Sequence, residues 1–378
     1  MVRLVFILLL VIHPAHACLW DRDTLAVEAK GKLDTVKAIT GWFDRYPPRY
    51  YEMRLERVIK ELSSDPKRLD LYDDAGVACS RLGHHDEAIN WMEKKMTILD
   101  TLPPADTADS RYRYLSNTGT FYLIRWIMTP QAARNADLDD LRSSETFIAQ
   151  ALEVNPDAHF GREKFQLMLI RWLLKEPAAE PFQQTSFVVN DGSFLPEEAR
   201  KGITGLIELG VAWQSVDTFR TLQDCLNNER NAYLARLAYL REDELLKAGM
   251  TSLHPSPGMP PYLANAEFGG LIEMLRPVDA YYTTARAAAD QRNAAWTAYQ
   301  DERFTKGMHP DTHPDFWKDW QEPAMPEIPK PTIFDKMKSP SNILAAVIFS
   351  TLGIGALAML LLLKSLIFGP HRSKKVSA

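Results

Sequence analysis

The amino-acid sequence predicts an all-α protein with a single membrane-spanning helix near its C-terminus. Apolar residues recur along most of the chain at the three- and four-residue spacing of helix faces. The alternation typical of strands is almost absent, and Ser186–Phe194 reads as a loop or small hairpin around a turn at Asp191-Gly192. The uncharged run Ile343–Leu363 would extend about 31 Å as a helix, enough to cross a bilayer.

The composition fits a folded protein without a nucleic-acid surface. Hydrophobic residues make up 46% of the 378 residues, charged residues make up 25%, and the formal net charge is -5. A nucleic-acid-binding surface usually needs a basic surplus, which this chain lacks. We therefore expect no nucleic-acid partner.

Residues 1–17 have the pattern of a secretory signal peptide. Arg3 precedes the apolar run Leu4–Ile12, and Ala15 and Ala17 offer the small residues that signal peptidase requires. A retained membrane helix is the alternative, but this run is too short to span a bilayer. Cys18 follows directly, so lipidation at this residue is a second alternative to simple cleavage.

The two ends together predict the topology. An exported N-terminus and the basic tail, residues 369–378, both place the C-terminus in the cytoplasm, with residues 341–368 as the transmembrane helix. No asparagine begins a glycosylation sequon, which favours a bacterial protein. We expect a single-pass protein of a bacterial inner membrane, with its ectodomain on the extracytoplasmic (periplasmic) side.

Cys79 and Cys225 lie on apolar helical stretches, where buried free thiols are common. A disulfide between them is the alternative in an oxidising compartment.

Leu71–Asp100 carries the clearest internal pattern. Its large and small residues recur at fixed positions: Tyr72, Gly76, Cys79, Gly83, Ala88, Met92 and Met96. This spacing resembles the tetratricopeptide repeat, in which two antiparallel helices cross closely at small residues and a turn glycine reverses the chain. The resemblance implies an α-solenoid over residues 67–250, with Gly76 and Ala88 at the crossing and Gly83 at the turn.

Two looser units resemble the first. Leu115, Gly119 and Tyr122 open the second, and Ala151 and Pro156 close it. The third unit has these residues in register: Phe219, Leu226, Ala235 and Tyr239. Arg230 stands in this unit where the turn glycine is expected. Residues 18–66 read as an N-terminal helical cap to the array.

The stretch Ala151–Phe165 collects charged residues beside a proline. Pro156 ends one predicted helix, and Asp157 suits the N-cap of the next. His159, Arg162 and Glu163 would then share a helix face, which predicts a joint between helices in preference to a catalytic cluster.

The region after residue 250 changes in composition. Residues 251–306 predict helices that Pro277 divides in two. Residues 307–340 are rich in proline and predict an extended spacer between ectodomain and bilayer.

We find no catalytic, nucleotide-binding or metal-binding signature, and we expect no enzyme activity, cofactor or metal. Asp21 and Asp23 are spaced as in a calcium loop, but the remaining ligands do not follow. His309 and His313 could chelate a metal, but Pro310 opposes the helical geometry that would align their rings.

The repeat resemblance implies a binding function. The segments Cys18–Leu25, Leu71–Asp74 and Asn155–Lys164 look like parts of a bacterial family of exported tetratricopeptide proteins of unknown activity. In such arrays the first helix of each pair lines a groove that binds a protein or peptide segment. The matching positions here are Asp70, Asp73, Val77, Ser80, Arg81, Arg113, Ser116 and Thr120. Two alternatives stay open: an enzyme acting on envelope glycans through residues 254–320, or a purely structural, self-associating component.

Overall fold

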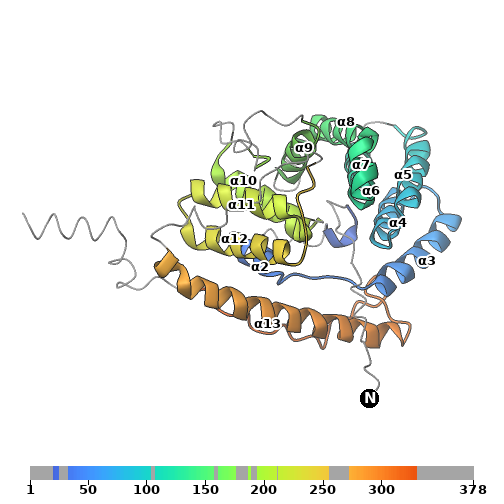
Figure 1. Ribbon diagram of the computed structural model, residues 1–378. Helices are drawn as coiled ribbons and strands as arrows, with labels where there is room; N and C mark the ends of the chain where they lie inside the picture. Colours follow the sequence, from blue (N-terminus) through green and yellow to red (C-terminus); the bar gives the residue numbers. More distant parts are fainter. Residues whose placement is uncertain are drawn as a thin grey trace, which may run out of the picture. The chain divides into compact units, whose positions relative to one another are not determined.

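A computed structural model describes residues 20–24, 33–103, 107–156, 161–175, 186–188, 194–210, 212–254 and 272–329. Within these residues the regular structure is helical and contains no strand, which confirms the predicted all-α class (Figure 1). The helices of residues 33–173 are α2 (Thr35–Thr40), α3 (Pro48–Ser64), α4 (Leu69–Arg81), α5 (His85–Leu99), α6 (Ala108–Met128), α7 (Gln131–Ala136), α8 (Asp139–Val154) and α9 (Arg162–Leu173). They are followed by α10 (Pro196–Glu208), the short 3₁₀ helix η4 (Ala212–Gln214), α11 (Val216–Asn228), α12 (Ala232–Lys247) and α13 (Ile272–Phe304).

The chain divides into two compact units. One comprises Met1–Ala264 and Val278–Glu327, and the other comprises Asn265–Pro277 and Ile328–Ala378. The contacts described below lie within the first unit.

Consecutive long helices of this unit pack against each other in chain order. Extensive contacts join α3 to α4, α4 to α5, α5 to α6, α6 to α8, α8 to α9, α9 to α10, α10 to α11 and α11 to α12. Helix α4 also packs directly on α6. The array is thus built from neighbours in sequence, and α4 and α6 share one side of it.

Glycines allow two of these helix crossings to be close. A Cβ atom on Gly76 of α4 would lie 3.0 Å from the Met92 side chain of α5 and 3.0 Å from the Phe121 ring of α6. A Cβ atom on Gly119 of α6 would lie 2.8 Å from Ile148 of α8. The two glycines occupy corresponding places in successive helix pairs.

The turns between paired helices use left-handed backbone conformations. Gly83, between α4 and α5, has φ +83°. Arg230, between α11 and α12, has φ 59° and is the non-glycine residue with positive φ in the described part of the chain. Arg230 therefore adopts the conformation that favours glycine, at the position where the repeat pattern expects one.

Helices α9 and α10 form a further close pair, which the sequence analysis did not predict. A Cβ atom on Gly202 would lie 2.0 Å from the Phe165 ring. Helix α9 begins at Arg162, directly after Gly161, which has φ 73°. Asp157 and His159 lie outside the described residues.

The predicted break at Pro277 is wrong, because α13 runs from Ile272 to Phe304 with this proline inside it. Pro277 lies in the second turn of the helix. There it removes one backbone hydrogen bond close to a terminus, which the rest of the long helix tolerates.

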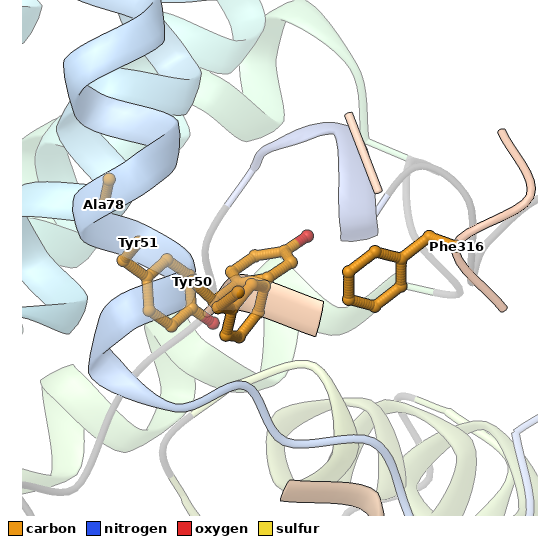
Figure 2. Close-up of a cluster of buried hydrophobic side chains, with 5 residues drawn as sticks. Tyr50, Tyr51, Ala78 and Phe316 are labelled. Atoms are coloured by element: carbon orange, nitrogen blue, oxygen red, sulfur yellow. The ribbon is translucent and has the colours of Figure 1, made fainter. Parts of the chain in front are cut away.

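The predicted extended spacer is also wrong for residues 307–329. Phe316 is fully buried and packs with Phe304 of α13 and with Tyr50, Tyr51 and Ala78 (Figure 2). The Trp317 ring stacks on Trp296 of α13 at 4.2 Å between ring centroids. Aromatic residues between the prolines thus fold this segment back onto α13 and α3.

Several predicted features fall outside the described residues: the signal peptide 1–17, Cys18, the turn Asp191-Gly192, the transmembrane segment 341–368 and the basic tail 369–378. Among the helices of the described residues, none is long and apolar enough to span a membrane. Cys79 and Cys225 are buried free thiols, not a disulfide.

Candidate functional site

The inner faces of α4 and α6 hold a short segment from the start of the described chain, residues 20–24, here called the N-terminal segment. The side-chain amide of Asn117 accepts a hydrogen bond from the backbone N–H of Trp20 (2.7 Å) and donates one to its carbonyl oxygen (3.0 Å). The Trp20 indole N–H donates to Ser116 Oγ (3.1 Å). Its ring meets the Tyr112 ring edge-on at 5.5 Å between centroids. Trp20 is consequently 4% exposed.

Asp74 of α4 binds Arg22, the basic residue of the N-terminal segment. It accepts hydrogen bonds from the backbone N–H of Arg22 (3.2 Å) and from Arg22 Nε (2.7 Å), and it also pairs with Arg22 Nη2. We call Asp74, Tyr112, Ser116 and Asn117 the cradle. The cradle therefore binds a backbone unit, an indole and a guanidinium of the chain's own N-terminal segment.

A buried ion pair supports the cradle from behind. Lys95 of α5 donates to both carboxylate oxygens of Asp73 at 2.7 Å, and Asn117 donates to Asp73 Oδ1 at 3.1 Å. Lys95 and Asp73 are both buried. This bonding fixes the orientation of the Asn117 amide, so the two hydrogen bonds to Trp20 are preorganised.

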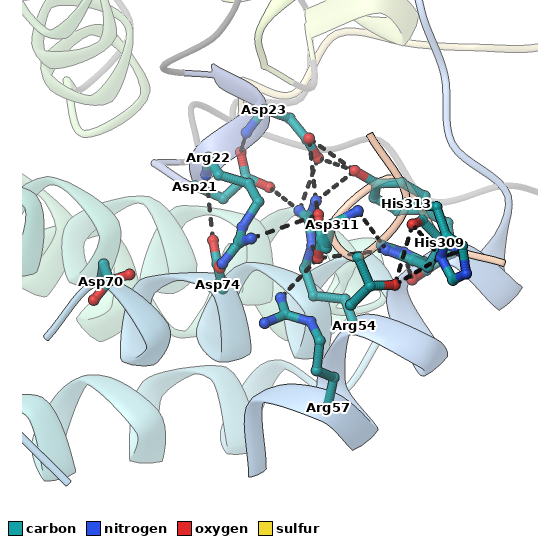
Figure 3. Close-up of polar contacts among 12 residues, drawn as sticks. Asp21, Arg22, Asp23, Arg54, Arg57, Asp70, Asp74, His309, Asp311 and His313 are labelled. Atoms are coloured by element: carbon teal, nitrogen blue, oxygen red, sulfur yellow. Dashed lines mark hydrogen bonds and ion pairs between the residues drawn. The ribbon is translucent and has the colours of Figure 1, made fainter. Parts of the chain in front are cut away.

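The two acids of the N-terminal segment bind Arg54 of α3 (Figure 3). Arg54 Nη1 donates to Asp21 Oδ2 (3.1 Å) and Asp23 Oδ2 (2.7 Å). On its other edge, Arg54 Nε and Nη2 donate to Asp311 at 2.9 and 2.8 Å. We call Asp21, Asp23, Arg54 and Asp311 the Arg54 junction. It joins the N-terminal segment to the folded-back segment that follows α13.

Other groups complete the charge balance of the Arg54 junction. Arg57 Nη2 donates to Asp311 at 2.7 Å, and Tyr50 Oη donates to Asp23. Burial raises the pKa of Asp21 to about 7, with further raising by Asp23 and Asp74 and only partial compensation by Arg54. Although burial opposes it, hydrogen bonding to Arg54 and its positive charge hold the pKa of Asp311 well below its ordinary value. Arg54 therefore stabilises the ionised form of Asp311 more than that of Asp21.

The residues predicted to line an open groove are mostly not accessible. Asp73, Val77, Ser80, Ser116 and Thr120 are all buried. Asp73 and Ser116 are in addition bonded to Lys95 and to Trp20. The expectation that these five present free surface is therefore wrong, because the N-terminal segment and neighbouring helices cover this face.

The remaining predicted groove residues are more exposed. Asp70 is ion-paired with Arg68, and Arg113 is ion-paired with Asp109. Arg81 is partly exposed.

Arg162 and Glu163, the described members of the predicted helix joint, are buried where α9 meets α6. Glu163 Oε1 accepts hydrogen bonds from Ser116 Oγ (3.3 Å) and Arg162 Nη2 (3.1 Å). The Arg162 guanidinium lies 5.7 Å from the centre of the Trp20 ring. Both residues thus support the cradle through structural contacts.

Histidine and acidic side chains that could have served as metal ligands or catalytic groups are bonded to other residues of the protein. His309 Nε2 lies 3.0 Å from the carbonyl oxygen of Tyr50, and burial lowers the pKa of His309 to about 4. Asp279 and Asp290 of α13 pair with Arg236 and Arg286. In the described part of the chain, no group of three His, Cys, Asp or Glu side chains could hold a metal ion.

Comparison of the chain with protein-family models, with curated proteins and with solved structures finds no match.

Sequence reasoning did not identify four residues that hold the N-terminal segment in place or join it to the segment after α13: Trp20, Arg54, Asn117 and Asp311. Their partners are distant in sequence, so no local spacing identifies them. One signal was available in the polar pair Ser116-Asn117, because it stands beside Gly119, which corresponds in the repeat pattern to the crossing residue Gly76. A polar residue at such a position needs a buried partner.

Proposed function

We propose that the chain is a non-catalytic binding scaffold, built as a tetratricopeptide-like α-solenoid and anchored in a bacterial inner membrane by its C-terminal helix. Its ectodomain would bind a protein or peptide segment at the extracytoplasmic face. The observation that carries the proposal is the cradle, where α4 and α6 already hold a peptide segment through its backbone and its side chains.

Two features make this face suitable for recognition. Its polar groups are held by helix packing and by the Asp73–Lys95 pair, so little ordering is needed when a segment binds. Its contacts combine an amide that reads backbone with side chains that read an indole and a guanidinium. Such a combination provides affinity and sequence preference at the same time.

Site-specific photo-crosslinking in intact cells would test the proposal. A crosslinking residue replaces Arg81 of α4 or Arg113 of α6, two partly exposed residues of the predicted groove, and Lys94 on α5 serves as the exposed control. We expect covalent adducts with a second polypeptide from positions 81 and 113, absent from position 94. These adducts should disappear when Asn117→Ala is added. Equal adducts from all three positions, or none from 81 and 113, would contradict the proposal.

A further inference from the structure

The N-terminal segment occupies the place where a partner segment would bind. Trp20, Asp21 and Thr24 are buried, and each acidic or basic side chain of the segment has a partner of opposite charge on α3 or α4. Residues 20–24 are joined covalently to α2 through residues 25–34. A ligand tethered by a short connection experiences an effective concentration on the order of millimolar, so it excludes weak competitors.

Dissociation of the N-terminal segment would affect the Arg54 junction and Asp74 differently. Arg54 keeps Asp311 at 2.8 Å, and Asp311 keeps Arg57 at 2.7 Å, so the positive charge at the junction stays paired. Asp74 has a side chain only 3% exposed and pairs with Arg22. When Arg22 leaves, Asp74 loses its hydrogen bond to Arg22 Nε and its ion pair with Nη2, while the positive charge of Arg54 stays nearby. An incoming cation at this place would restore both contacts.

The contacts of Trp20 set a second requirement for any segment that replaces residues 20–24. When Trp20 leaves, Asn117 loses its two backbone hydrogen bonds and Ser116 loses the indole N–H. An incoming segment that covered this face without replacing these bonds would leave the Asn117 amide oxygen buried without a donor, which is unfavourable. A replacement must therefore present a backbone unit with an aromatic donor, followed two residues later by a cation.

Resting on the proposed function, we infer that the partner of this face is a peptide segment with an aromatic residue two positions before an arginine or lysine, and that it binds by displacing residues 20–24. Asp74 selects the cation, and Tyr112, Ser116 and Asn117 select the aromatic residue and its backbone. The acids at positions 21 and 23 strengthen the resident segment through Arg54, but Asp311 makes them dispensable in an incoming segment.

A binding experiment with a synthetic peptide separates these roles. The probe is a fluorescent peptide with the sequence of residues 19–25, LWDRDTL, titrated with the full-length protein in detergent. The wild-type protein should bind it weakly, because its own segment competes. Arg22→Ala in the protein removes the resident contact to Asp74 while leaving the cradle intact, and we expect the peptide to bind at least about tenfold more tightly.

Two peptide variants test the selection rule against the Arg22→Ala protein. Replacement of the tryptophan by alanine, or of the arginine by glutamate, should each weaken binding at least about tenfold. Replacement of both aspartates by asparagine should have a much smaller effect. The matched protein control is Arg49→Ala, which should behave as wild type: Arg49 is exposed on α3, and its ion pairs among the described residues are with Glu52 and Glu56.

The outcomes distinguish this inference from the proposed function. Equal binding of the peptide to wild-type and Arg22→Ala proteins, or equal binding of all peptide variants, would overturn the inference. If crosslinking from positions 81 and 113 still captured a second polypeptide, the scaffold proposal would stand with a different partner chemistry. A thermal melt of Arg22→Ala checks that the variant, which lacks the cation paired with Asp74, is still folded.

Discussion

Arg54 and Asp311 are joined by two hydrogen bonds, of 2.9 and 2.8 Å, across a sequence separation of 257 residues. Both side chains are buried, with exposed fractions of 0% for Arg54 and 3% for Asp311. The same guanidinium binds Asp21 and Asp23. Arg54 is thus the point at which the N-terminal segment, α3 and the segment after α13 are held together.

Replacement of Arg54 by methionine should destabilise the protein strongly. It would leave Asp21 and Asp311 buried without this cation, and loss of one partner of a buried ion pair typically costs about 3–5 kcal/mol. Urea denaturation followed by circular dichroism measures the change. Arg49→Met on the exposed side of the same helix is the control and should change the free energy of unfolding by less than about 1 kcal/mol. Similar values for the two variants would mean that the junction contributes little.

The pH dependence of stability should depend on Asp21. Its pKa is raised to about 7 in the folded protein, from an ordinary value of 3.8. Between about pH 4 and pH 7 the folded state then holds a proton that the unfolded state has lost, so Asp21 lowers stability as the pH rises through this window. Above about pH 7 both states are ionised and this contribution becomes constant.

Asp21→Asn removes this titration. The free energy of unfolding of the variant minus that of the wild type should increase from about pH 4 to about pH 7 and then level off. The lowered pKa of His309 gives a slope of opposite sign below about pH 6.5, and because both proteins contain His309, the difference largely cancels it. Denaturation curves at intervals across this range provide the measurement. A difference that does not vary with pH would show that Asp21 is ionised throughout.

Local sequence spacing predicted the features that depend on neighbouring residues. The helical periodicity, the close approach of Gly76 to α5 and the turn at Gly83 all arise within one helix or one helix pair. The bonds of Trp20 to Asn117 and of Arg54 to Asp311 cannot be read in this way, because 97 and 257 residues separate the partners. Each of these side chains, taken alone, is as compatible with a solvated surface as with a buried pair.

The segment after α13 shows a second limit of sequence reasoning. Prolines near residues 310–329 indicate an irregular backbone, and the structure agrees with that much. They say nothing of whether the segment is extended or packed. That depends on Phe316 and Trp317 finding Phe304 and Trp296, which belong to another element.

Gly202→Ala should destabilise the pair formed by α9 and α10. Its new methyl group would lie 2.0 Å from a ring carbon of Phe165, a fully buried residue that cannot move without disturbing its neighbours. Overpacking of this kind costs about 1–3 kcal/mol. Gly205→Ala in the same helix is the matched control, because its nearest contact is an ordinary 3.4 Å to Leu33. Thermal melts should show a lower midpoint for Gly202→Ala and an unchanged or higher midpoint for Gly205→Ala, since alanine is the better helix former.

Arg230→Gly should stabilise the turn between α11 and α12. Arg230 has φ 59°, a conformation that costs a residue with a Cβ atom roughly 1–2 kcal/mol, whereas glycine adopts it freely. Part of this gain is offset because glycine has more conformational freedom in the unfolded chain, so we expect a net increase of about 0.5–1 kcal/mol in the free energy of unfolding. Arg230→Ala shortens the same exposed side chain but keeps the Cβ atom, and it should give no increase. If alanine stabilises the protein as much as glycine does, the effect comes from the removed guanidinium and not from the backbone conformation.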